Sequence, residues 1–159
     1  MEEKMDKWQE LVEHLQEEGA LVQDRITVEH LHRAQLEGRT TSIEEGGCVV
    51  AFGALWPTES AGWCEVGTIW VHPNCRGRHF SKQVFMVLMR KIVQIRLQAF
   101  LITDKDCIAH LATAANWRED NSWGKTSAVP IQLVGHRQYR DTNQQRRLFF
   151  FKNEQARKE

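Results

Sequence analysis

Apolar residues recur at helical spacing in two stretches near the start of the chain, residues 2–18 and 28–37. Such a repeat places the apolar side chains on one face of a helix and leaves the other faces to Glu, Lys and Gln. Thr27 is an N-cap candidate for the second helix, and Gly38 is a C-cap candidate. The apolar positions are Trp8, Leu11, Val12 and Leu15 in the first stretch and Val28, Leu31 and Ala34 in the second.

The pattern then changes to β-branched and apolar runs. Thr, Ile and Val flank Glu-Glu-Gly-Gly, which predicts a hairpin that turns at Gly46 and Gly47. A further run over residues 63–71 completes three consecutive antiparallel strands. Gly67 lies inside this last run, and an interior glycine is typical of a bulge or of close approach by another backbone.

The strongest helical repeat runs from Phe80 to about Arg96. A compact β-like run at residues 98–104 and a helical stretch at residues 106–117 follow it. This strand, helix, strand order implies a parallel crossover. The remaining segments are a predicted loop at 118–126, a predicted strand at 127–135 that Pro130 weakens, and a predicted strand at 146–152.

These elements predict an α/β (α+β) fold, a mixed and largely antiparallel sheet with flanking helices. At 159 residues and 42% hydrophobic, the chain suits one domain with a core and is short for two. We expect a single domain over residues 1–152 and a frayed tail over residues 153–159.

The net charge gives no long-range attraction to a polyanion, so any site for one must be local. Lys plus Arg and Asp plus Glu both total 21, so no net field attracts nucleic acid or an anionic membrane. The first residues are charged throughout, unlike a signal peptide, and no 18 apolar residues run together. A cytoplasmic protein without membrane contact is expected.

Cysteine and histidine spacing leaves one metal alternative. The four cysteines lie far apart, so reduced thiols are expected. His72, Cys75 and His79 have the spacing H-x2-C-x3-H, and Cys107 with His110 would complete a zinc site. Short spacings of this kind are of low specificity, so we expect no metal.

The stretch from Val71 to Lys82 carries the most specific chemistry. A strand leads through a tight turn into a helix N-terminus, where unpaired N–H groups and the helix dipole favour anions. Gly77 allows close approach of the backbone, and Arg76, Arg78 and Lys82 add positive charge. A diphosphate is a reasonable ligand on this chemistry.

The residues V-x-P-x-x-R-G-R-x-x-S at 71–81 resemble the acetyl-CoA-binding motif of the GNAT superfamily of N-acetyltransferases. In that motif Arg or Gln is followed after two residues by Gly and, one residue later, by Gly or Ala. Arg76 falls on the first position, His79 on the central glycine and Ser81 on the last small residue. Histidine departs from the pattern, because its Cβ stands where pyrophosphate approaches bare backbone. The order of elements resembles the family over about residues 25–152, although the usual first strand is not apparent.

The resemblance implies an N-acetyltransferase that uses acetyl-CoA as cosubstrate and acts on a primary amine by direct attack in a ternary complex. It implies that the backbone of residues 69–71 holds the pantetheine arm. The implied cofactor-binding residues are Ile69, Trp70, Val71, Arg76, Gly77, Arg78, His79, Phe80, Ser81 and Lys82.

The resemblance also suggests catalytic roles. Glu65 lies eleven residues before Arg76, as the catalytic glutamate does in histone-modifying relatives, so it is the first candidate for general base. The alternative for Glu65 is a strand carboxylate facing solvent. The N–H of Val71 would hold the oxyanion. Relatives often use a tyrosine to protonate the thiolate; Thr113 lies near that position, and Tyr139 is the only tyrosine.

The acceptor is not encoded in these motifs. It could be a small molecule, a protein or an aminoacyl-tRNA, the last because some small GNAT toxins act on charged tRNA. A basic patch around Tyr139 could recognise an acidic acceptor or RNA, or be a solvated loop; its members are Arg137, Arg140, Arg146 and Arg147. A homodimer through C-terminal strands stays open. A GNAT-like binding module without catalysis is the main alternative function.

Overall fold

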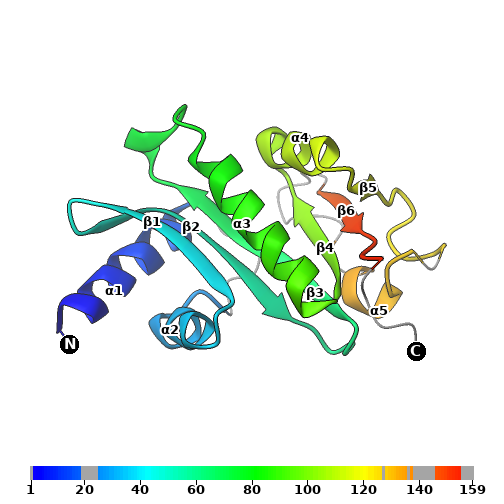
Figure 1. Ribbon diagram of the computed structural model, residues 1–159, viewed down its shortest axis with the longest axis horizontal. Helices are drawn as coiled ribbons and strands as arrows, with labels where there is room; N and C mark the ends of the chain where they lie inside the picture. The colour runs from blue at the N-terminus through cyan, green and yellow to red at the C-terminus, as the bar shows by residue number, and fades with distance from the viewer. Residues whose placement is uncertain (1, 19–24, 127, 136, 138–145, 155–159) are drawn as a thin grey trace. The chain divides into compact units, whose positions relative to one another are not determined.

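The computed structural model describes residues 2–18, 25–126, 128–135, 137 and 146–154 (Figure 1). Its elements, in chain order, are α1 (Glu2–Glu17), α2 (Val28–Leu36), β1 (Thr40–Glu45), β2 (Cys48–Pro57), β3 (Trp63–Val71), a 3₁₀ turn (Pro73–Cys75), α3 (Phe80–Ile95), β4 (Gln98–Thr103), α4 (Asp106–Ala114), β5 (Arg118–Glu119), α5 (Ile131–Val134) and β6 (Arg147–Phe151).

The strands are hydrogen-bonded in the order β1-β2-β3-β4-β6-β5. β1 pairs antiparallel with β2, and β6 pairs antiparallel with both β4 and β5. β3 and β4 are parallel and are joined through α3, as the predicted crossover requires. The α/β fold with a mixed, largely antiparallel sheet is therefore confirmed.

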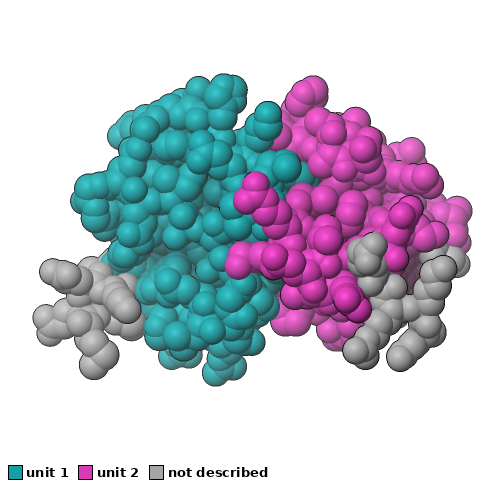
Figure 2. All heavy atoms as spheres, viewed as in Figure 1, with its two compact units in different colours: residues 1–55, 68–88 teal, residues 56–67, 89–159 magenta. Residues whose placement is uncertain are grey.

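Internal contacts divide the chain into two compact units (Figure 2). Unit 1 comprises Met1–Leu55 and Thr68–Leu88, and unit 2 comprises Trp56–Gly67 and Met89–Glu159. β3 contributes its first residues to unit 2 and its last residues to unit 1. The single domain over residues 1–152 stays a prediction, and each unit is described by itself below.

Unit 1 is organised by the apolar faces of α1 and α2. All four apolar positions of the α1 stripe are buried. Trp8 packs edge to face against Phe52 of β2, with the ring centroids 6.0 Å apart. The Thr27 hydroxyl accepts a hydrogen bond from His30 N at 3.1 Å, which confirms the predicted N-cap. The β1–β2 hairpin turns at Gly46 and Gly47, both with positive φ.

Helix α3 packs closely on β2 within unit 1. A Cβ on Gly53 would lie 2.5 Å from Val84 Cγ1 and 3.0 Å from Leu88 Cδ1, so only glycine fits without rearrangement. Gly53 therefore sets how closely the start of α3 approaches the strand.

Unit 2 is built on the β4–β6 ladder, which runs from Ala99↔Phe151 to Thr103↔Arg147. Asn153, the first residue of the predicted tail, is 3% exposed. Its side-chain Nδ2 donates to Ile92 O at 3.1 Å and to Leu97 O at 3.0 Å. The end of α3 is thereby tied to the segment after β6.

Two predicted segments are wrong. The predicted strand at 127–135 contains the short helix α5, with Pro130 as its N-cap residue. The fixed φ of proline is compatible with the start of a helix, so the apolar residues after Pro130 form a helix and not the predicted strand. The predicted loop at 118–126 contains β5, whose two residues are charged and exposed and so carry no alternating pattern.

Candidate functional site

The loop after β3 is fixed by local hydrogen bonds. His72 N donates to Val50 O at 2.8 Å, and Cys75 N donates to His72 O at 2.8 Å. The His72 Nδ1 accepts from Asn74 N at 3.0 Å, which caps the 3₁₀ turn. The first half of the loop thus has little freedom before the basic residues begin.

Two residues of the loop lie in the left-handed region. Gly77 has φ 86°, and His79, the residue before α3, has φ 63°. Left-handed backbone costs an L-residue about 1–2 kcal/mol, whereas glycine adopts it without that penalty. His79 therefore keeps the backbone conformation that a glycine would favour, and its exposed side chain is accommodated.

The N-terminus of α3 presents backbone donors. Gln83 N donates to His79 O at 3.2 Å, the first hydrogen bond of the helix. The N–H groups of Phe80, Ser81 and Lys82 precede that bond, and the helix dipole adds partial positive charge to them. This turn has the arrangement that anions bind in other proteins.

Both arginines of the loop contact carboxylates within unit 1. Arg76 forms an ion pair with Glu18, and its Nε donates to Val71 O at 3.3 Å. Arg78 makes a bidentate contact with Glu45 at 2.9 and 2.6 Å. The hydrogen bond from Arg78 lowers the pKa of Glu45. A phosphate bound here would have to compete with these carboxylates.

Residues 69–71 form the end of β3. Ile69 lies against Gly53 and Trp70 stacks on His14 of α1 with ring centroids 5.2 Å apart, so successive side chains point to opposite faces. Thr68, directly before them, has φ 58°. A positive φ at a β-branched residue is unusual, so the backbone of β3 is locally irregular at Thr68, although the strand continues to Val71. The four-pair ladder of β3 with β4 ends earlier, at Val66↔Leu101.

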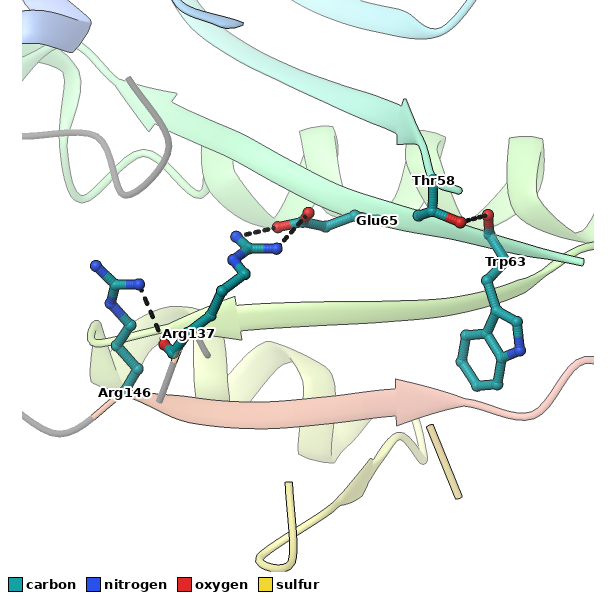
Figure 3. A network of polar contacts seen from close by, with 5 residues as sticks. All are labelled: Thr58, Trp63, Glu65, Arg137 and Arg146. Carbon is teal, nitrogen blue, oxygen red and sulfur yellow. Dashed lines mark hydrogen bonds and ion pairs between the residues drawn. The ribbon is translucent and has the colours of Figure 1, made fainter. Parts of the chain in front are cut away.

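Glu65 lies in that ladder, opposite Phe100, and is 4% exposed. Its two carboxylate oxygens accept hydrogen bonds from Nη1 and Nη2 of Arg137, both at 2.8 Å (Figure 3). The alternative of a strand carboxylate facing solvent is therefore wrong. The sequence offered no signal for this pair, because the partners are 72 positions apart.

Cys64, the neighbour of Glu65, is also buried. Burial, followed by the negative charge of Glu65, raises the pKa of the Cys64 thiol to about 12. The thiol stays protonated near neutral pH, so Cys64 is no candidate nucleophile.

The two candidates for protonating the thiolate stay predictions. Thr113 is exposed on α4, and its hydroxyl donates to Ala109 O at 2.9 Å, within its own helix. Tyr139 lies outside the described residues.

The arginines of the basic patch that the structure describes form hydrogen bonds or ion pairs. Arg146 Nη1 donates to Arg137 O at 3.1 Å (Figure 3), while Arg147 pairs with Glu119 and lowers the pKa of that carboxyl. Arg140 lies outside the described residues. The interpretation as a solvated loop is wrong for Arg137, whose side chain is 14% exposed.

Neither a metal cluster nor a membrane span is present in the part of the chain that the structure describes. Three or more His, Cys, Asp or Glu side chains that could hold a metal ion do not gather there. The proposed zinc ligands differ in environment, since Cys75 is buried and His79 is exposed. The helices there also lack the length and apolar character needed to cross a membrane.

Comparisons with known proteins give one consistent family. The chain is 34% identical over 100 residues to the amino-acid acetyltransferase of Aliivibrio fischeri (strain ATCC 700601 / ES114), a match that covers 60% of this chain and 21% of the relative. The chain thus spans about a fifth of the length of the curated relatives that it matches.

Solved structures share the fold at low sequence identity. N-acetylglutamate synthase from Neisseria gonorrhoeae, solved with coenzyme A and N-acetyl-glutamate, has a TM-score of 0.64 and 14% identity, covering 90% of this chain and 31% of that one. A Mycobacterium tuberculosis protein solved with CoA has a TM-score of 0.64 and 14% identity, covering 93% and 96%.

The family model described as "Acetyltransferase (GNAT) family" matches residues 5–113, which is more than half of the chain. This span includes α3, the loop before it and the strand that carries Glu65. The chain belongs to the acetyltransferase (GNAT) family.

Proposed function

We propose that the chain transfers the acetyl group of acetyl-CoA to a primary amine by direct attack in a ternary complex. The observation that carries this proposal is the turn from Arg76 to Lys82, whose backbone donors, positive φ values and positive side chains suit a diphosphate. It is supported by the family to which the chain belongs.

Acetyl-CoA would bind to two segments of unit 1, the end of β3 and the turn that leads into α3. The N–H groups of Phe80, Ser81 and Lys82 would receive the diphosphate, with Gly77 and His79 shaping the turn. Positive charge would come from Arg76, Arg78 and Lys82. To contact a phosphate, the two arginines would leave the carboxylates with which they pair in this structure. The backbone of Ile69, Trp70 and Val71 would hydrogen-bond the pantetheine arm.

The chemistry then needs few groups. The acceptor amine must lose a proton and attack the thioester carbonyl, and Val71 N–H would stabilise the oxyanion. Glu65 would accept the amine proton through an ordered water, since its oxygens already accept from Arg137. Thr113 or Tyr139 would protonate the thiolate, although a thiol with a pKa of about 8.5 leaves without an acid.

We propose free amino acids as the first acceptors to test. The support is the activity named for the Aliivibrio relatives, amino-acid acetyltransferase, and the N-acetyl-glutamate in the Neisseria complex. Peptides and aminoacyl-tRNA remain the other classes to screen. The proposed site of action is the cytoplasm, and a homodimer through C-terminal strands is a separate proposal.

Calorimetric titration with acetyl-CoA tests the cofactor proposal. We expect stoichiometric binding by the wild-type chain and at least about tenfold weaker binding by Ser81→Glu, because a carboxylate at the helix start repels phosphate. Gln94→Glu adds the same charge on exposed surface of the same helix and should bind normally. Absence of heat at high micromolar cofactor would contradict the proposal.

Thiol release in the presence of an amine panel tests catalysis. Acetyl-CoA binding without thiol release for any amino acid, peptide or aminoacyl-tRNA would favour the alternative, a GNAT-like binding module without catalysis. Stoichiometric zinc in the purified chain would instead favour the metal alternative.

A further inference from the structure

We propose that Arg137 is a positioning residue for Glu65, which holds the carboxylate in one orientation and in its charged form for proton transfer. This inference rests on the proposed acetyl transfer and extends it to a residue on the segment after α5. Both residues belong to unit 2, so the proposal concerns one compact unit.

The contact between the two side chains is planar and bidentate. Nη1 and Nη2 of Arg137 each donate to a different oxygen of Glu65 at 2.8 Å. The Glu65 side chain is 6% exposed and the Arg137 side chain 14%, so water screens the pair little. A guanidinium that meets a carboxylate in this way fixes both its plane and its direction, which a lysine cannot do.

Arg137 is itself held at both sides of its backbone. Its N–H donates to Val134 O at 3.0 Å, at the end of α5, and its carbonyl accepts from Arg146 Nη1 at 3.1 Å (Figure 3). Gly135 N donates to Ile131 O at 2.8 Å within the same turn. The guanidinium therefore extends from an anchored main chain.

Helix α5 rests on a turn that a buried carboxylate organises. Asp120, 5% exposed, accepts from Ser122 N at 2.9 Å and from Gly124 N at 3.0 Å. A Cβ at Gly124 would lie 2.6 Å from Ile131 Cα, so the turn touches the backbone of α5 directly. The turn, α5, Arg137 and Glu65 thus form a continuous chain of contacts.

The pair has a clear effect on the proton acceptor. A guanidinium in this bidentate contact favours the charged form of a carboxylate over the neutral form. Among the described residues, the Cys64 thiol, which stays neutral, neighbours Glu65, and Arg146 contacts the Arg137 carbonyl. Without Arg137, a buried carboxylate would face unbalanced desolvation and would take up a proton more readily.

Four variants test the proposal through the pH dependence of acetyl transfer. Arg137→Met removes the charge and keeps a long side chain, while Arg137→Lys keeps the charge and loses the fork. Glu65→Gln removes the proton acceptor, and the double variant Glu65→Gln with Arg137→Met removes the pair without leaving a buried charge. Acetyl-CoA binding is measured for each, because the cofactor loop lies in unit 1.

For Arg137→Met we expect kcat to fall about 100-fold, with the acid limb of the pH–rate profile moved upward by about one pH unit or more. Arg137→Lys should lower kcat while leaving that limb near its wild-type position. Glu65→Gln should lower the rate more at neutral than at high pH, and adding Arg137→Met should then cost little further activity. The double variant should unfold at higher denaturant than Arg137→Met alone.

A remote change provides a further readout. Gly124→Ala should lower kcat with little change in acetyl-CoA affinity, because the added Cβ requires α5 to shift. The control is Gly62→Ala, whose Cβ would lie in open space, and its kcat should be close to that of the wild type. Folding of Gly124→Ala is checked by thermal unfolding; the Arg137 series carries the test if it does not fold.

The outcomes separate the two proposals. An active Arg137→Met variant with an unchanged pH profile would overturn the positioning role alone. Full additivity of Arg137→Met and Glu65→Gln in kcat would do the same. A wild-type chain that binds acetyl-CoA and acetylates no amine would overturn the proposed function, and the role of Arg137 in catalysis with it.

Discussion

Adjacent residues on β3 show how burial decides chemistry at the scale of one side chain. Glu65 and Cys64 are both buried in unit 2, yet Glu65 has a guanidinium partner, whereas the charge that acts on Cys64 is the negative carboxylate of Glu65. Burial of a carboxylate is tolerated because Arg137 balances it. Burial of the thiol, with a carboxylate next to it, favours the neutral form instead.

Cys64 should therefore resist alkylation. Its pKa is raised from 9.0 to about 12 by burial and then by the charge of Glu65, so iodoacetamide should label the exposed Cys48 and Cys107 well before Cys64. Mass spectrometry of the labelled chain measures this. Labelling of Cys64 at the rate of Cys107 in the folded chain would contradict it.

The same shift predicts a pH dependence of stability. Between pH 9 and pH 12 the unfolded chain loses the Cys64 proton and the folded chain keeps it, so stability falls as pH rises through that window. The slope should approach about 1.4 kcal/mol per pH unit and should be smaller in Cys64→Val, as measured by chemical unfolding.

At the scale of elements, the connection from β3 to α3 combines a capped 3₁₀ turn with two left-handed residues. The hydrogen bonds of His72 fix where the turn begins, and Gly77 and His79 fix where the helix begins. The result is a set of backbone donors at the start of α3. This connection does not need glycine at position 79 to keep its shape.

Replacing His79 by glycine should separate the backbone from the ring. His79→Gly keeps the left-handed backbone and removes the Cβ, so we expect several-fold tighter acetyl-CoA binding with stability changed by no more than about 1 kcal/mol. His79→Ala retains the Cβ and should not gain affinity. Weaker binding by both variants would show that the ring contacts the cofactor.

At the scale of the whole molecule, the chain forms two compact units, and β3 contributes residues to both of them. Unit 1 carries the loop proposed for the cofactor, and unit 2 carries Glu65 with its partner. The segment after β6 belongs to unit 2, where the Gln98 side chain donates through Nε2 to Asn153 O and accepts through Oε1 from Asn153 N.

We expect Asn153 to stabilise unit 2. Asn153→Ala removes the donors to Ile92 O and Leu97 O, and we expect a loss of about 1–3 kcal/mol in the free energy of unfolding. Glu154→Ala, at an exposed neighbour, should change it little. Equal denaturation midpoints for the two variants would show that Asn153 does not anchor the chain end.

Local patterns predicted much of this protein. The apolar stripes of α1 and α2, the Thr27 cap, the glycine turn between β1 and β2 and the basic loop before α3 each depend on residues close in sequence. The predicted strand at 127–135 was wrong, because Pro130 is compatible both with a weak strand and with the start of a helix. β5 was missed because its two residues are charged and exposed, so they carry no alternating apolar pattern.

The sequence by itself determined the order of most elements, the family motif and the place of Glu65 on a strand, since helical and strand periodicity and turn chemistry act over a few residues. Only the tertiary structure decided that Glu65 is buried and which side chain balances its charge. That outcome depends on Arg137, 72 positions away, and on the turn and helix that hold it. Burial and ion pairing sum contacts from distant parts of the chain, which no local pattern contains.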